Sequence, residues 1–345
     1  MAERKLLYSR AENEALRQEM QRDASVFIMG EDVAGAAGRA AQGFLDAWGG
    51  PMGATKGLIQ EFGPDRVRDT PICEMSFIGA AVGAALTGMR PVAELLFVNF
   101  VGVSLDSIMN EGAYLRYMLG GQVSVPMVVR TAIGATAMAP PDGGGSAAQH
   151  SGSGYSVFAH IPGLKCVAPS DAYTAKGLLA AAIRDDDPVV YCTHRRLMGT
   201  SCDVPEESYT WPIGQARTLR QGKDVTLVGI SYMTHVCLEA AERLAGEGIE
   251  AEVIDLLSLS PIDYPQILES VRKTKHLVVV DEDQPHCSVA REIAAVVADE
   301  GLNYLDGPIK TVTGAHAPVP FAGVLEAAFV PDAARVAGAV KAAFD

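Results

Sequence analysis

The chain has 345 residues, of which 48% are hydrophobic and only 6% aromatic, so it is long enough for two domains with buried cores. Its formal net charge is −14 and it has no run of basic residues. This argues against nucleic acid as a partner, because phosphates would meet a repulsive field.

Cysteine usage and hydropathy indicate the compartment. The six cysteines form no C-x-x-C pair, and no signal-like segment precedes Glu3 and Arg4. The longest apolar stretch, 76–89, is shorter than the roughly 20 residues that a membrane crossing needs. We therefore expect a cytoplasmic protein with reduced thiols and no transmembrane segment.

The first part of the chain alternates between short apolar runs and helical patterns. We predict strands at 26–29, 92–97, 126–130 and 188–191, and helices at 74–86 and 173–183. Glu31 and Asp32 directly follow the first strand, at the edge where open α/β sheets bind ligands. Residues 33–53, rich in Gly and Ala, indicate an irregular surface segment.

A long loop is predicted at 131–149, with Pro140, Pro141 and three consecutive glycines. A loop of this length inside a compact domain is usually functional or mobile. The glycine run lacks the strand-turn-helix spacing of a phosphate cradle, so it favours a flexible loop.

The remainder predicts a second α/β domain. Polar residues at 199–222 form the linker candidate, which divides the chain into domains at 1–198 and 223–345. We predict strands at 225–230, 251–256 and 276–280, and helices at 234–246, 262–271 and 288–298. This alternation implies right-handed crossovers and a parallel sheet.

Glu74 is the first residue of interest for chemistry. Its position at the start of an apolar helix fits a carboxylate that is merely favoured by the helix dipole. The alternative is functional: the following helix is apolar except for Ser76, and a carboxylate held there would have a raised pKa and could share a proton with a heterocycle.

His150 follows the long loop, between Gln149 and Ser151. It fits either a surface histidine or a general acid/base whose pKa lies near physiological pH. The sequence has no Walker A element, G-x-S-x-G elbow or H-E-x-x-H. The residues alone therefore indicate a two-domain α/β protein with a carboxylate and a histidine of interest.

Several longer stretches resemble a known family. They are Gly30-Glu31-Asp32-Val33, Asp69-Thr70-Pro71-Ile72-Cys73-Glu74, Leu115-Arg116-Tyr117-Met118 with Gly120-Gly121, Gln149-His150-Ser151, residues 158–165, Ala175-Lys176-Gly177-Leu178-Leu179 and Ala182-Ile183-Arg184-Asp185. From about residue 5 to the C-terminus, the chain resembles the β subunit of the thiamine-diphosphate-dependent decarboxylating component of 2-oxo acid dehydrogenase complexes.

This resemblance implies an architecture and partners. The fold would be α/β, with a transketolase-like pyrimidine-binding domain, whose parallel sheet is flanked by helices, and a C-terminal doubly wound α/β domain. Two such chains would join two α subunits in a heterotetramer, with thiamine diphosphate between an α and a β chain. The acyl group would pass to lipoamide on a transacylase partner.

The resemblance also implies roles for individual residues. Glu74 would bind the aminopyrimidine ring nitrogen, with Glu31 beside it. Phe100 would stack on the pyrimidine ring, and the backbone of Ile72 would line the same pocket. His150 matches the family histidine that assists acyl transfer to the lipoyl group.

The resemblance also implies two metal ions. The carbonyls of Met127, Ala182, Asp185 and Asp187 match positions that hold a structural potassium ion in some relatives. Related enzymes bind magnesium and diphosphate through a Gly-Asp-Gly element, which this sequence lacks. We therefore expect the magnesium ligands to come from the α subunit.

The substrate is the least determined feature. Residues 283–288 and 318–321 look most like the acetoin-cleaving branch, so we rank acetoin first, pyruvate second and branched-chain 2-oxo acids third. Two departures from the family pattern, Gly152 after His-Ser and a longer loop before His150, lie near the expected substrate entrance. The alternatives are the C-terminal half of a split transketolase and a non-catalytic structural paralogue.

Overall fold

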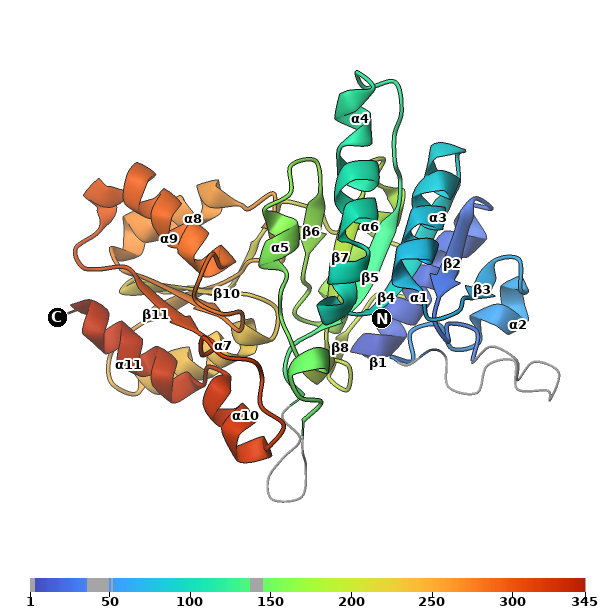
Figure 1. Cartoon of the computed structure of the whole chain (residues 1–345). Helices are drawn as coiled ribbons and strands as arrows, with labels where there is room; N and C mark the ends of the chain where they lie inside the picture. The colour runs from blue at the N-terminus through green and yellow to red at the C-terminus, as the bar shows by residue number, and fades with distance from the viewer. Residues whose placement is uncertain (1–3, 36–49, 51, 137–144, 345) are drawn as a thin grey trace. The chain divides into compact units, whose positions relative to one another are not determined.

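The computed structural model describes residues 4–35, 50, 52–136 and 145–344. The chain forms two compact units (Figure 1). The first comprises 1–133 and 157–213, and the second comprises 134–156 and 214–345. The predicted boundaries at 1–198, 199–222 and 223–345 stay a prediction. Within the described part of the chain, no helix is both long and apolar enough to span a bilayer.

The first unit is built on a parallel sheet. Its strands are β2 (Val26–Gly30), β3 (Val67–Asp69), β4 (Arg90–Phe97), β5 (Val128–Ile133), β6 (Lys165–Val167) and β7 (Val189–His194), in the spatial order β6-β7-β5-β4-β2-β3. Strands β2, β5 and β7 are buried along their whole length, as expected for parallel strands covered by helices on both faces. The strand order reverses between β2 and β4, which defines a topological switch point.

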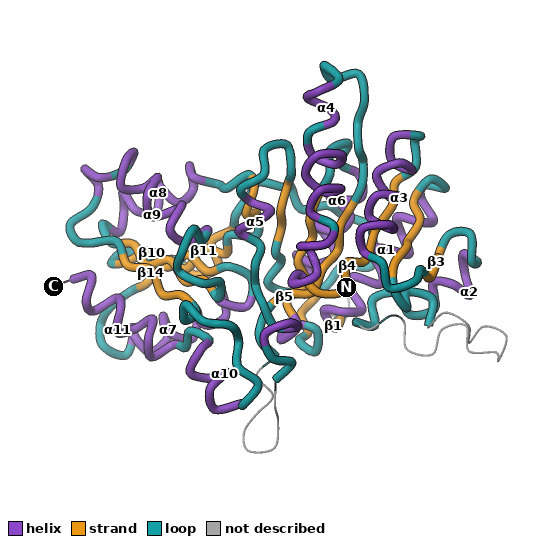
Figure 2. The backbone as a smooth tube through the Cα atoms, viewed as in Figure 1, coloured by secondary structure: helices purple, strands orange, loops and turns teal. Residues whose placement is uncertain are grey.

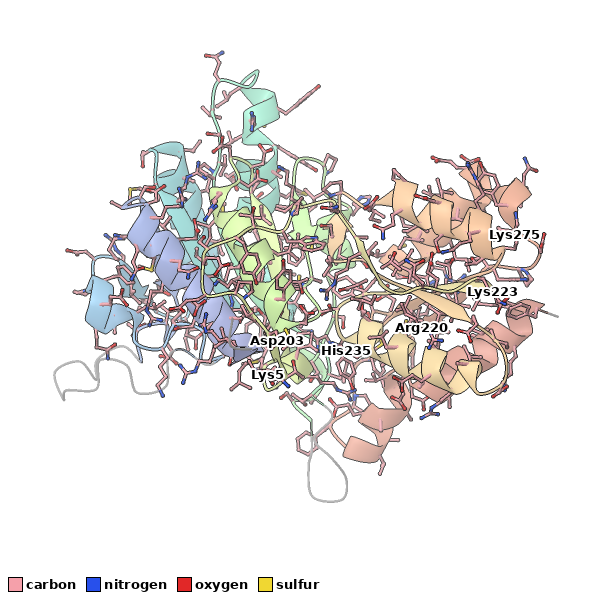
Figure 3. All side chains as sticks on the ribbon, turned by 180° about the vertical axis from the view of Figure 1, so that it is seen from behind. Lys5, Asp203, Arg220, Lys223, His235 and Lys275 are labelled. Atoms are coloured by element: carbon pink, nitrogen blue, oxygen red, sulfur yellow. The ribbon has the colours of Figure 1, made fainter. Side chains whose placement is uncertain are left out.

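Helices cover both faces of this sheet. Helices α1 (Tyr8–Arg22) and α6 (Ala172–Arg184) pack together on one face, whereas α3 (Glu74–Leu86) and the π-helix η3 (Ser107–Ala113) pack on the other (Figures 1 and 3). Shorter elements are α2 (Leu58–Phe62), η2 (Val98–Val103), α4 (Leu115–Met118), α5 (Ser156–Ala159) and η5 (Arg195–Leu197).

A buried ion network links three elements of the first unit. Arg130 in β5 donates to Glu12 of α1 and to Glu94 of β4, with nitrogen–oxygen distances of 2.6 Å in each pair. Thr193 in β7 donates its hydroxyl to Glu12 at 2.6 Å. The network therefore joins a covering helix to the centre of the sheet.

Two short strands lie in the predicted linker. Strand β8 (Ser201–Asp203) pairs antiparallel with β1 (Lys5–Leu7), with Lys5 opposite Asp203 (Figure 3). Strand β9 (Arg217–Arg220) pairs antiparallel with β11 in the second unit. Neither strand has an apolar run, which is why the sequence pattern did not indicate them.

The second unit contains a five-stranded sheet in the order β14-β13-β10-β11-β9. The strands β10 (Val225–Gly229), β11 (Ala251–Asp255), β13 (Leu277–Asp281) and β14 (Lys310–Thr313) are parallel, as the strand-helix alternation predicts. Helices α7 (Tyr232–Ala245) and α11 (Ala333–Phe344) cover one face, and α8 (Tyr264–Thr274) and α9 (Val289–Glu300) cover the other (Figures 1 and 2). The remaining elements are β12 (Ser258–Ser260), η4 (Ala148–His150), η6 (Leu302–Tyr304) and α10 (Gly323–Phe329).

Two predicted irregular segments fall largely outside the described residues. These are 33–53, of which 36–49 and 51 are not described, and the loop 131–149, of which 137–144 are not described. The described residues on either side of the second gap, 134–136 and 145–156, belong to the second unit. We call these residues the strap.

Candidate functional site

Two carboxylates lie close to the switch point of the first sheet. Glu31 directly follows β2, and Glu74 is the first residue of α3. Burial, followed by the negative charges of Asp32 and Glu74, raises the pKa of Glu31 above its usual range. Glu31 and Glu74 therefore interact electrostatically, as expected for a pair of carboxyl groups that share one site.

Gly30 explains how β2 can deliver Glu31 to this edge. A Cβ at Gly30 would lie 2.7 Å from the Cβ of Glu94 on the neighbouring strand β4. Only glycine allows the two backbones to come this close. A larger residue would push the end of β2 away from β4 and displace Glu31 with it.

Exposed apolar side chains flank Glu74 in the sequence. Ile72 is 75% exposed and Met75 is 59% exposed, on either side of the half-buried Glu74. Phe100 lies in η2, directly after β4, and its ring meets Phe97 edge-on with centroids 5.7 Å apart. Exposed apolar groups next to a carboxylate suit a flat nitrogen heterocycle, which offers a face for packing and a ring nitrogen for a hydrogen bond.

His150 lies at the end of η4 and is half-buried. It belongs to the second compact unit, whereas Glu31, Ile72, Glu74 and Phe100 belong to the first. The site residues predicted from the sequence thus fall into two groups. Those around Glu74 lie in the first unit, and His150 lies in the second.

Sequence reasoning missed four carboxylates around the strap. Asp281 ends β13, Glu282 and Asp283 follow it, and Glu326 lies in α10. All four are buried. A signal was present for three of them, because acidic residues after a buried strand are the same pattern that identified Glu31.

Three of the four carbonyls predicted for potassium accept hydrogen bonds. Met127 accepts from the Val189 N–H at 3.0 Å, and Ala182 accepts from the Asp185 N–H at 3.3 Å. The carbonyl of Asp185 accepts from the Arg90 guanidinium at 2.8 Å. A carbonyl oxygen has two lone pairs, so these hydrogen bonds leave one for a further ligand, and potassium at the four positions stays a prediction.

Comparison with known proteins identifies the domains and relatives. Residues 4–200 match the family model of the transketolase pyrimidine binding domain, and residues 214–336 match the transketolase C-terminal domain. The chain is 50% identical to the β subunit of acetoin:2,6-dichlorophenolindophenol oxidoreductase from Cupriavidus necator, over 98% of this chain and 97% of the relative. It is 43% identical to the pyruvate dehydrogenase E1 component β subunit from Rickettsia felis, over 95% of each chain.

A solved structure described as a split gene transketolase, inactive beta4 tetramer, has the same fold, with a TM-score of 0.74 and 24% identity over 98% of both chains. Fold and domain matches together define a transketolase-type α/β protein with a pyrimidine-binding and a C-terminal domain. Within that class, the chain belongs to the family of β subunits of acetoin and pyruvate dehydrogenases. The predicted family and fold class are therefore confirmed.

Proposed function

We propose that this chain is the β subunit of a thiamine-diphosphate-dependent enzyme that cleaves acetoin and passes the acyl group to lipoamide on a transacylase partner. The observation that carries the proposal is the interacting pair Glu31 and Glu74 beside exposed apolar groups at the switch point of the pyrimidine-binding domain. Higher identity to the acetoin relative, 50% against 43%, supports acetoin ahead of pyruvate, with branched-chain 2-oxo acids third.

Glu74 performs the central task of this chain. Its carboxyl group would donate its proton in a hydrogen bond to the aminopyrimidine ring nitrogen and hold the proton at that nitrogen. Glu31, whose pKa is raised, remains protonated more readily and so limits the repulsion between the two carboxyl groups. Phe100 and the backbone at Ile72 orient the ring. Thiamine diphosphate supplies the electron sink for carbon–carbon bond cleavage.

The remaining roles require other chains. The α subunit supplies the magnesium and diphosphate ligands, because the sequence has no Gly-Asp-Gly element. Two α and two β chains would form the active heterotetramer, and His150 would assist acyl transfer to the lipoyl group. The six free cysteines support a reducing, cytoplasmic location.

Potassium at Met127, Ala182, Asp185 and Asp187 stays a prediction. Repeating the thermal denaturation of the β chain in potassium and in choline chloride at equal ionic strength tests it. A bound ion raises the midpoint in potassium only.

The split transketolase is the second candidate, because its fold matches over nearly the full chain. Its 24% identity, against 50% for the acetoin relative, supports only the shared fold. Turnover of sugar phosphates without lipoamide would favour it. A complex that binds thiamine diphosphate but turns over no substrate would favour the non-catalytic paralogue.

The test is reconstitution. We would co-purify the chain with candidate α subunits and measure thiamine-dependent reduction of 2,6-dichlorophenolindophenol with acetoin, pyruvate and branched-chain 2-oxo acids. Glu74→Gln should lower the rate at least about 100-fold, since positioned proton transfer contributes about 10²–10⁴-fold. The matched control is Glu61→Gln, which alters an exposed carboxylate that pairs with Arg17 and should keep the parent rate. Equal rates for both variants would contradict the role of Glu74.

A further inference from the structure

We propose that buried carboxylates of the second unit position His150, by holding the strap at the carboxyl end of the second sheet. This inference rests on the proposed function, because it concerns the acyl-transfer step assigned to His150. It adds Asp281, Glu282 and Glu326 as positioning residues, none of which touches the reacting groups.

The topology of the second sheet explains why the strap lies there. The strand order reverses between β10 and β13, and open α/β sheets normally bind a ligand in the crevice outside this switch point. Here Asp281 and Glu282, at the end of β13, accept hydrogen bonds from the strap. The strap therefore lies at the carboxyl end of β13, beside this switch point.

Tyr155 forms the anchor on the C-terminal side of His150. Its hydroxyl, in a side chain that is 1% exposed, donates to Asp281. The next residue, Ser156, donates its hydroxyl to Asp283 at 2.8 Å. Two adjacent hydrogen bonds to buried carboxyl groups fix this end of the strap, because a buried polar group that loses its partner is costly.

Glu282 forms an anchor on the N-terminal side. Its Oε1 accepts from the Ala135 N–H at 2.6 Å, and the side chain is buried. The neighbouring Gly134 donates its N–H to the carbonyl of Gly152 at 3.0 Å. This bond ties the two described parts of the strap together close to His150.

Glu326 in α10 contacts the strap at two places. Its Oε1 accepts from the Thr136 N–H at 2.9 Å. A Cβ at Gly145 would lie only 2.6 Å from the same oxygen, and the Gly145 N–H donates to the Phe321 carbonyl at 2.8 Å. Figures 1 and 2 show the strap beside α10. Glu326 therefore binds the strap at Thr136 and lies close to it at Gly145, where the Phe321 carbonyl supplies the hydrogen bond.

These anchors constrain His150 from both directions. It lies midway in sequence between Gly145 and Tyr155, and each of those residues is fixed to the second unit. Small displacements of a catalytic group lower rates strongly, so weakening one anchor should affect the step that uses His150 more than any other step.

The principal test uses Tyr155→Phe in the reconstituted α/β complex, with Tyr191→Phe as the matched control. Tyr191 is also fully buried, but its hydroxyl donates to the Ala175 carbonyl in the first unit. We expect Tyr155→Phe to lower acyl transfer to free lipoamide at least tenfold, while acetoin-dependent reduction of 2,6-dichlorophenolindophenol stays within about twofold of the parent. Amide hydrogen exchange in peptides covering 145–156 should accelerate in this variant only.

A second pair separates hydrogen bonding from folding. Glu282→Gln keeps an oxygen acceptor for the Ala135 N–H, whereas Glu282→Ala removes it. The glutamine variant should retain most of the acyl transfer that the alanine variant loses. If Tyr155→Phe does not fold, this pair of variants still tests whether a hydrogen bond to the strap positions His150.

Three results would overturn the proposal. A parallel fall of both activities would indicate a merely structural role. Unchanged exchange in peptides covering 145–156 would overturn the anchor itself, whether or not the complex is active. A parent complex that turns over none of the substrates would overturn the proposed function and, with it, the acyl-transfer role, while the exchange measurement would still report on the anchor.

Discussion

At the scale of single residues, Asp281 has the most unusual environment. Burial, followed by the negative charge of Asp283, raises the pKa of Asp281 to about 7, although the Tyr155 hydroxyl and two backbone N–H groups favour its charged form. The surrounding titratable groups also include Glu282, which follows it directly. Asp281 therefore takes up protons across the range between an ordinary carboxyl pKa and neutrality.

We expect the stability of the β chain to depend on pH through Asp281. Because the folded-state pKa exceeds that of the unfolded chain, the folded state binds more protons between about pH 4 and pH 7. The free energy of unfolding should therefore fall as pH rises through this window, by up to about 1.4 kcal/mol per pH unit. Asp281→Asn, which cannot ionise, should remove this contribution.

Thermal midpoints of the parent and of Asp281→Asn, measured from pH 4 to pH 8, test this expectation. The difference between the two should favour the variant increasingly as pH rises. Parallel pH profiles would show that Asp281 keeps an ordinary pKa.

Individual site residues differ in how far sequence can predict them. Glu31 and Glu74 are found locally, because each lies at the boundary of a strongly patterned strand or helix. Glu282 and Glu326 act on residues 147 and 190 positions away in the sequence. No local pattern carries information on such contacts.

At the scale of elements, the network of Arg130, Glu12 and Glu94 connects α1 to the sheet. Burial alone would lower the pKa of Arg130, but the two carboxylates reverse this and raise it well above its usual value. Burial also raises the pKa of Glu94, even though Arg130 opposes that shift. Burial of these three charged side chains is thus tolerated only when all three are present.

We predict that Arg130→Met destabilises the β chain by about 3–5 kcal/mol, because it leaves two buried carboxylates without a cation. The matched control is Arg220→Met on β9, which breaks a partly exposed pair with Glu250 (Figure 3) and should cost less than about 1 kcal/mol. Denaturant unfolding of the two variants compares them. Similar losses would show that Arg130 contributes no more than a surface ion pair.

This network also explains why the sequence pattern predicts α3 but not α1. The buried face of α1 includes Glu12 and Glu19 among its apolar residues, and Glu19 pairs with Arg184. Charged residues on the buried face interrupt the apolar stripe that indicates a helix. Helix α3 buries only apolar side chains, so its predicted bounds, 74–86, agree with the structure.

At the scale of the whole molecule, the charge of the chain disfavours the binding of a diphosphate. Its net charge is −14, which repels an anion. Among the described residues, no group of three or more His, Cys, Asp or Glu is arranged to bind a metal ion. We therefore predict that the isolated β chain binds thiamine diphosphate with magnesium at least 100-fold more weakly than the α/β complex.

Calorimetric titration of the β chain and of the complex, in the same buffer, checks this prediction. Adding the α subunit should restore binding. Comparable affinity of the isolated chain would show that it carries its own diphosphate site.

The division of the second unit into two separate stretches of chain affects how the protein folds during synthesis. Ala135 and Thr136 leave the ribosome long before Glu282 and Glu326, their partners 147 and 190 residues later. At about 5–20 residues per second, the delay is on the order of ten to forty seconds. The strap cannot reach its final position until translation is nearly complete. The surroundings of His150 are therefore among the last parts of the protein to form.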